Sequence, residues 1–276
     1  MAGTVCRRCV TGAPPDAFFA DGQDWTTPPL HPEIDRSNGY GYLRGCLRSH
    51  MRHASALRID HMMSFHRLFW VPAGMDAAAG VYVTYPADEL YAVLSAESHR
   101  HETEVVGEDL GTVPAGVRAA MRRHGIARTF VFLGSLRVRG ENMTSRVPSG
   151  SVVTLETHDM VPLFGLLQGD DIRTRVETGQ LDPGAARGEH AQRRRLIARL
   201  TRSFEAEGSN PAETARRVLA GTLECMARSA ARTVLVGLDD LLLERQPQNV
   251  PGTRDERTNW RRKMAATLED LPRASG

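Results

Sequence analysis

Three acidic residues stand at or just after the ends of short apolar runs, where they are placed to do chemistry together. They are Asp60, Glu108 and Asp159. Short apolar runs bounded by polar residues are typical of strands buried in a parallel sheet. Because the carboxyl ends of parallel strands line one edge of a sheet, we expect the three carboxylates to converge on one pocket.

Cleavage of a glycosidic bond with retention of configuration is the chemistry that such a set favours. It uses two carboxyl groups about 5–5.5 Å apart. One attacks the anomeric carbon, and the other protonates the leaving oxygen and then deprotonates the acceptor. A third carboxylate can bind sugar hydroxyls and help to distort the ring. Arg58 adds a cation two residues before Asp60.

Other interpretations of the same residues stay open. A single acid at a strand end is commonly a helix cap or a surface residue, and the glycine-flanked Glu108 also suits a turn. His61 and His158, together with the acids, would also suit a metal-dependent hydrolase. Cys6 and Cys9 have the spacing of a metal pair, but no second pair follows, so we predict no metal there. The recurrence of three acids in order favours glycosyl transfer.

Alternating strand and helix patterns position these acids. We predict strands at 56–60, 103–108, 129–133, 151–157 and 233–238, and helices at 35–53, 87–101, 114–124, 189–207, 211–230 and 256–269. Apolar strands that alternate with helices indicate an α/β fold with a parallel sheet covered on both faces. A closed (β/α)₈ barrel needs eight strands, so the pattern fits either an open sheet or part of a barrel.

The chain is predicted to divide into an N-terminal loop and a region of strands and helices. Residues 1–34 are rich in proline and glycine and are predicted to form a long irregular loop. Residues 35–276 carry the strands and helices, and the whole chain, 1–276, is expected to form one domain.

The composition narrows the class of protein. The net charge is +2, from 35 basic and 33 acidic residues, which argues against nucleic-acid binding. No apolar run approaches the roughly 20 residues of a membrane helix, and no signal peptide is apparent. The four cysteines form no disulfide framework, which favours the cytoplasm.

The segments around the acids resemble one family. They read Ala-Leu-Arg-Ile-Asp-His at 56–61, Gly-Glu-Asp-Leu-Gly-Thr-Val-Pro at 107–114 and Thr-His-Asp at 157–159. With Gly-Gln-Asp-Trp at 22–25 and Pro-Gln-Asn-Val-Pro-Gly-Thr at 247–253, they resemble the amylomaltase family of 4-α-glucanotransferases, within the α-amylase clan. The resemblance implies that the chain is the C-terminal five or so strands of a (β/α)₈ barrel, incomplete at its N-terminal side.

The resemblance also implies a role for each residue. Asp60 is expected to be the nucleophile, Glu108 the general acid/base and Asp159 the acid that stabilises the transition state. The expected substrate contacts are Arg58, His158, Trp25, Asn249 and Gly252, with residues 1–34 on the substrate side. No cofactor or metal is implied, and the implied partners are maltooligosaccharides and α-1,4-glucans.

Two departures from the family lead to further expectations. The early barrel strands of the family precede the segment with which this chain begins. We therefore weigh an inert remnant, one that binds glucan or a partner chain supplying an N-terminal half, against an active transferase. Leu167 stands where the family usually has a tryptophan, which predicts weaker stacking on glucan.

Overall fold

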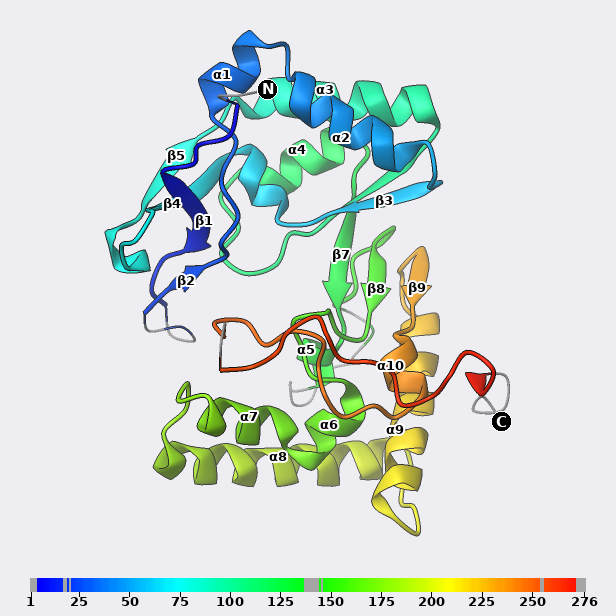
Figure 1. The fold of residues 1–276 in the computed structure, drawn as a ribbon. Helices are drawn as coiled ribbons and strands as arrows, with labels where there is room; N and C mark the ends of the chain where they lie inside the picture. The colour runs from blue at the N-terminus through cyan, green and yellow to red at the C-terminus, as the bar shows by residue number, and fades with distance from the viewer. Residues whose placement is uncertain are drawn as a thin grey trace. The chain divides into compact units, whose positions relative to one another are not determined.

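The computed structural model describes residues 4–16, 19, 21–136, 144, 146–253 and 256–271. The chain divides into two compact units, Met1–Thr129 (unit 1) and Phe130–Gly276 (unit 2). Figure 1 labels the helices and strands of both. The single domain expected over 1–276 stays a prediction.

Unit 1 begins with an antiparallel sheet. Its strands are β1 (Cys9–Ala13), β2 (Gln23–Asp24), β4 (Arg67–Pro72) and β5 (Val81–Thr84), in the order β2-β1-β4-β5. The prediction of an irregular loop over 1–34 is therefore wrong at β1 and β2, as well as at the start of α1 (Pro32–Ser37). Pro14 and Pro15 directly follow β1 in the sequence, but pairing with β4, a strand some sixty residues away along the chain, supplies its hydrogen bonds.

The parallel strands of unit 1 are β3 (Ala56–Ile59), β6 (Glu104–Gly107) and β7 (Ala127–Val131), the last of which runs across the unit boundary. β3 pairs with β6 and β6 with β7, both in parallel. Gly107 is closely packed, because a Cβ there would lie 2.7 Å from Cε of Met121, 3.0 Å from Cγ of Met62 and 3.1 Å from Cγ2 of Ile126. Within the described residues β3 pairs on one side only, so it is half exposed rather than buried as its apolar run suggested.

Helices cover these strands. They are α2 (Gly41–Met51), α3 (Ala87–His101) and α4 (Val117–Arg123), with the short turns η1 (Met62–Phe65) and η2 (Ala77–Ala79). α3 buries Leu90, Tyr91 and Leu94, whose three- and four-residue steps put them on one face. Figure 1 shows α2 and α3 side by side.

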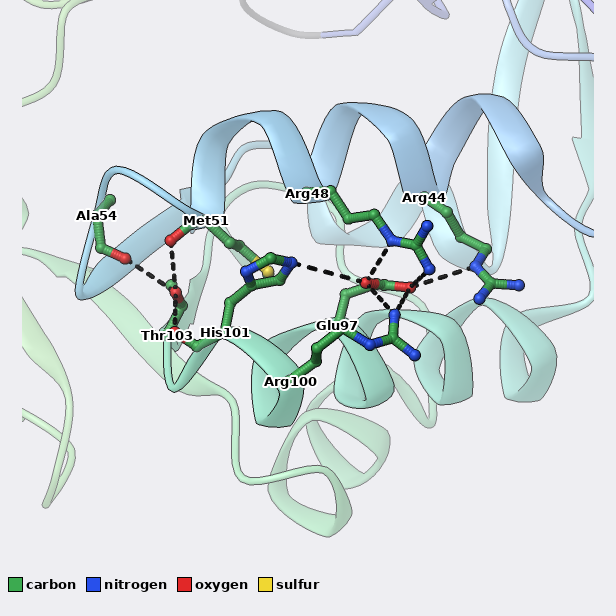
Figure 2. A network of polar contacts seen from close by, with 8 residues as sticks. All are labelled: Arg44, Arg48, Met51, Ala54, Glu97, Arg100, His101 and Thr103. Carbon is green, nitrogen blue, oxygen red and sulfur yellow. Dashed lines mark hydrogen bonds and ion pairs between the residues drawn. The ribbon is translucent and has the colours of Figure 1, made fainter.

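A buried glutamate joins α2 to α3 (Figure 2). Glu97 is 1% exposed and accepts hydrogen bonds from Arg48 Nε at 2.8 Å, Arg100 Nη1 at 2.6 Å and Arg44 Nε at 3.2 Å. The Arg48 contact, ahead of those with Arg100 and Arg44, lowers the pKa of Glu97 to about 2, against the opposing effect of burial. The carboxylate is thus held ionised as a cross-link between two helices.

Unit 2 contains β8 (Val152–Thr154) and β9 (Thr233–Leu235), which pair in parallel. Phe132 and Leu133, directly after β7, donate their N–H groups to the carbonyls of Thr154 and Leu155 at 2.8 and 3.0 Å. The helices are α5 (Leu133–Leu136), α6 (Leu163–Gln168), α7 (Asp170–Glu177), α8 (Pro183–Ser203), α9 (Pro211–Ala227) and α10 (Leu238–Leu241).

The ends of the long helices in unit 2 follow from local sequence. α8 and α9 both have proline in the first turn, preceded by the caps Asp182 and Asn210. Each cap side chain accepts a hydrogen bond from a backbone N–H of its own helix. The buried faces of these helices join β8 in one apolar core.

Most predicted elements are present, but several differ from the prediction. The predicted helix 35–53 is divided into α1 and α2, the predicted helix 189–207 begins at Pro183 and ends at Ser203, and β4 and β5 were not predicted. The five predicted parallel strands correspond to β3, β6, β7, β8 and β9, and the predicted helix 87–101 is confirmed as α3. The predicted helix 256–269 is wrong. Those residues form turns and extended chain, and Trp260, at φ 61°, donates its N–H to Gln248 instead of to a residue one helical turn earlier. The predicted strand 233–238 ends early because α10 begins at Leu238, and α6 and α7 were not predicted.

No helix in the described part of the chain has both the length and the apolar character needed to cross a membrane. All four cysteines are free thiols.

Candidate active site

Asp60 follows β3 and is paired with Arg58, two residues earlier on the same strand. Arg58 Nη1 lies 2.6 Å from Asp60 Oδ1. The two side chains share one face of the strand because strand residues alternate in direction. The Asp60 side chain is 61% exposed. The ion pair therefore orients a carboxylate that remains open to a ligand.

Glu108 follows β6, the neighbour of β3, and it is only 8% exposed. Its Oε2 accepts the N–H of His61 at 2.9 Å, and its Oε1 accepts the N–H of Leu110 at 2.5 Å. Burial raises the pKa of Glu108, and the charge of Asp60 raises it further, while the two backbone N–H groups and Arg58 oppose the shift. A carboxyl group with a raised pKa can hold a proton for a leaving group.

His61 connects the two acids. It directly follows Asp60, and its N–H group bonds Glu108. Its backbone is left-handed, with φ 49° and ψ 60°, which turns the chain sharply after β3. Its ring meets the ring of Trp25 edge to face at 5.2 Å, and the indole N–H of Trp25 is held by Gln23 at 3.1 Å. Trp25, from the segment after β2, therefore lies next to the residue that joins both acids.

Asp109 anchors the loop that follows Glu108. This side chain is 1% exposed, and its Oδ2 accepts hydrogen bonds from Nε of Arg118 and of Arg128, each at 2.7 Å. The two arginines come from α4 and β7. Asp109 therefore fixes the backbone on which Glu108 stands, a role that the sequence alone did not suggest.

Unit 2 groups another set of the predicted residues. Asn249 Nδ2 donates to Asp159 Oδ1 at 2.6 Å, across ninety residues of sequence. His158 Nε2 lies 3.4 Å from Asp159 Oδ2. Trp260 lies beside His158, with ring centroids 5.4 Å apart, and is 61% exposed. An exposed indole next to an oriented carboxylate is a surface on which a sugar ring can stack.

The loop that carries Asn249 is held by its own hydrogen bonds. Asn259 Oδ1 accepts the N–H of Val250, and Asn259 Nδ2 donates to Thr253 Oγ1 at 2.9 Å. Gly252 has φ +78° within this turn, a conformation that favours glycine. Gly252 therefore shapes the loop that presents Asn249.

The structure thus brings the predicted residues together in two groups. Unit 1 holds Trp25, Arg58, Asp60 and Glu108 around His61, and unit 2 holds His158, Asp159 and Asn249. Trp260 was not assigned to the site because its segment was expected to be a helix, although the adjacent Asn-Trp pair was a usable signal. Within the described residues, no group of three or more His, Cys, Asp or Glu side chains is arranged to hold a metal ion.

The amino-acid sequence of this chain is similar to those of known proteins. The family model described as 4-alpha-glucanotransferase matches residues 3–268. The 4-alpha-glucanotransferase of Mycobacterium tuberculosis is 36% identical over 95% of this chain and 37% of its own length. That of Haemophilus influenzae is 32% identical over 95% of this chain and 39% of its own. The chain therefore spans well under half the length of these relatives.

Solved structures agree with the sequence comparison. Amylomaltase from Corynebacterium glutamicum superposes with a TM-score of 0.79 and 28% identity, over 99% of this chain and 43% of its own. Amylomaltase from Streptococcus agalactiae, solved in complex with acarbose, gives a TM-score of 0.71 at 16% identity, over 97% of this chain and 50% of its own. The second likeness shows the fold alone. The predicted fold class, an α/β chain that matches part of an amylomaltase barrel, is confirmed.

Proposed function

The chain belongs to the 4-alpha-glucanotransferase family, and on this premise we propose that it transfers segments of α-1,4-glucans between maltooligosaccharides. The reaction is a double displacement with retention at the anomeric carbon. The observation that carries the proposal is the contrast between two acids on neighbouring strands: exposed, arginine-paired Asp60 and buried Glu108 with its raised pKa.

In the first step, a carboxylate oxygen of Asp60 bonds to the anomeric carbon while the glycosidic bond breaks. Glu108 gives its proton to the leaving 4-oxygen, so a shorter glucan departs and Glu108 becomes a carboxylate. In the second step, Glu108 takes the proton of an acceptor 4-hydroxyl, whose oxygen attacks the anomeric carbon and frees Asp60. The geometry of retaining enzymes places these groups about 5–5.5 Å apart.

The other residues are proposed to bind and position the sugar. Asp159 stabilises the positive charge that develops on the ring, and Arg58 and His158 contact the sugar at the cleaved bond. Trp25 lies on the acceptor side, and Asn249 and Gly252 belong to the loop at the rim. Support comes from the contacts of Asn249 and His158 with Asp159, which orient that carboxylate.

A second candidate function is retained from the sequence analysis. In it, the chain binds α-1,4-glucan, or a partner chain that supplies further barrel strands, without turnover by itself. A cytoplasmic location stays a prediction from the sequence.

Incubation of the chain with maltotriose tests the first candidate. Transfer yields glucose and a ladder of longer oligosaccharides, which chromatography resolves. We expect Asp60→Asn to abolish the ladder and Asp76→Asn, at an exposed position of unit 1, to leave it. A ladder that survives Asp60→Asn would rule out the assigned nucleophile. A folded chain that gives no ladder but binds maltoheptaose in calorimetry would establish the second candidate.

A further inference from the structure

Two carboxyl groups of unit 2 that the proposed reaction does not use meet beside Gly237. Glu156 directly precedes the Thr157-His158-Asp159 segment, and Asp240 belongs to α10. A Cβ placed on Gly237 would lie 2.9 Å from Glu156 Oε1 and 3.3 Å from Asp240 Oδ2. Both oxygens therefore border the space that a Cβ of Gly237 would fill, and glycine at 237 leaves that space open between the chain and the two carboxyl groups.

The two oxygens of Asp240 have different surroundings. Asp240 is 1% exposed, and its Oδ1 accepts the N–H of Leu163 at 2.7 Å. Its Oδ2 is buried and has no hydrogen-bond partner. A buried acceptor without a donor is costly, so a proton on the facing Glu156 carboxyl would satisfy it.

These contacts lie at the two ends of the segment that carries Asp159. Glu156 lies just before that segment, two residues after the end of β8, and Leu163 lies just after it, as the first residue of α6. Asp240 accepts the N–H of Leu163 and, like Glu156, lies beside Gly237. One side chain from α10 can therefore fix both ends of the segment 157–162.

We propose that Glu156 and Asp240 share one proton, and that this carboxyl pair holds the segment 157–162 so that Asp159 is positioned for transfer. The pair acts through Asp159 and not on the sugar, so its two members are positioning residues. The proposal rests on the proposed function, because it is Asp159 that the pair positions.

The charges around the pair favour retention of the proton. Burial raises the pKa of Glu156 to about 8, with further contributions from the charges of Asp240 and Asp239. Burial likewise raises the pKa of Asp240 to about 6, while the N–H of Leu163 opposes the shift. Two carboxyl groups that face each other titrate as a pair, and the first proton to bind is held by both.

The cation that pairs with Asp239, Arg262, already has two carboxylate partners. Arg262 lies 2.5 Å from Asp239 and 3.3 Å from Glu244. When the pair loses its proton, Glu156 and Asp240 are both negative, and Asp239 adds a third charge. Repulsion then separates Glu156 from Asp240 and releases the start of the Asp159 segment.

Thermal unfolding tests the shared proton without any need for activity. Glu156→Gln keeps an N–H donor toward Asp240 at every pH, whereas wild-type Glu156 loses its proton. In the wild type the stabilising proton is fully present below the ordinary pKa of glutamate and is lost as the pH rises through about 8. We therefore expect the Tm of the wild type, relative to Glu156→Gln, to fall between pH 5 and 8 and to level off above.

The control is Glu177→Gln, at an exposed position of α7, whose Tm should follow the same pH dependence as that of the wild type. Parallel curves for Glu156→Gln and wild type would overturn the shared proton.

The pH profile of transfer tests the positioning. We expect kcat of the wild type to fall on the alkaline side, and kcat of Glu156→Gln to hold to higher pH. Glu156→Ala should lower kcat about ten- to a hundredfold at all pH values, with little change in KM, because small misplacements of catalytic groups are costly. Because ionisation of Glu108 gives both enzymes an alkaline limb, the deciding quantity is the ratio of kcat for Glu156→Gln to kcat for the wild type. A ratio that does not rise between pH 5 and 8 overturns the positioning role. If the wild type shows no transfer, the proposed function fails, while the Tm curves still decide whether the proton is shared.

Discussion

Glu97 and Glu108 are both buried carboxyl groups of unit 1, yet their pKa values are shifted in opposite directions. Glu97 lies between α2 and α3 and accepts hydrogen bonds from the guanidinium groups of Arg48, Arg100 and Arg44. Glu108 stands at the end of β6 and accepts two backbone N–H groups. The pKa of Glu97 is lowered to about 2, and the pKa of Glu108 is raised.

The difference lies in the charge of the donors and in the weight of burial, which is the largest influence on the pKa of Glu108 and the second on that of Glu97. Burial raises the pKa of both glutamates, but only Glu97 has enough cations in contact to reverse the effect. A buried carboxylate among arginines serves as a structural cross-link. A buried carboxyl group with neutral donors, beside another acid, is suited to give and take a proton. Comparing the two distinguishes a structural glutamate from the candidate acid/base within the same unit.

The largest expected effect is the loss of transfer in Glu108→Gln. The amide cannot donate a proton to the leaving oxygen or accept one from the incoming hydroxyl. General acid–base catalysis contributes about 10²–10⁴-fold, so we expect a loss of that size in kcat with maltotriose. Circular dichroism should show an unchanged fold. A Glu108→Gln enzyme with wild-type turnover would contradict the assignment.

The second effect is on stability, in Glu97→Gln. The change leaves Arg44, Arg48 and Arg100 without their counter-charge at the interface of α2 and α3. Breaking a buried ion pair costs about 3–5 kcal/mol, and because these arginines are about half exposed we expect roughly 2 kcal/mol. Urea unfolding measures the loss, with Glu33→Gln on exposed α1 as the matched control. Equal midpoints for Glu97→Gln and Glu33→Gln would show that the cross-link adds no stability.

The third effect is the pH dependence of the Glu97 cross-link. Its pKa is lowered from the ordinary value of 4.5 to about 2, so its contribution is present above pH 4.5 and is lost as the pH falls toward 2. The unfolding free energies of wild type and Glu97→Gln should therefore converge as the pH falls from 6 to 3. A gap that stays constant over this range would mean that the ionised form is not what stabilises the interface.

The smallest effect is the stability change in Glu108→Gln, and its pH dependence has the opposite sign. With its raised pKa, Glu108 disfavours the folded state increasingly as the pH rises through its ordinary range. Gln removes this cost, but its single oxygen leaves the N–H of either His61 or Leu110 without an acceptor. We expect a net change within about 1 kcal/mol at pH 7. The stability of the wild type relative to the variant should fall from pH 4 to 7, and a rise over that range would reverse the assignment.

The sequence predicted the strands that carry the candidate acids because their signals are local. Short apolar runs that end in Asp60 and Glu108 mark β3 and β6, and the steps of Leu90 and Leu94 mark α3. The resemblance to the amylomaltase family rested on contiguous motifs at these same strand ends. Side-chain alternation and helical periodicity are properties of neighbouring residues, so they can be read without the fold.

The tertiary structure decided everything that depends on partners distant in the chain. β1 was not predicted because Pro14 and Pro15 follow it, and only its pairing with β4 reveals the strand. Trp260 was assigned to a helix, whereas its N–H bonds Gln248. The opposite pKa shifts of Glu97 and Glu108, and the approach of Glu156 and Asp240 to Gly237, depend on groups brought together by folding. By itself the sequence therefore determined the candidate residues for the chemistry and most of the elements on which they stand. Only the folded chain determined which carboxyl groups hold a proton, because the pKa of a buried acid is set by the donors and charges in contact with it.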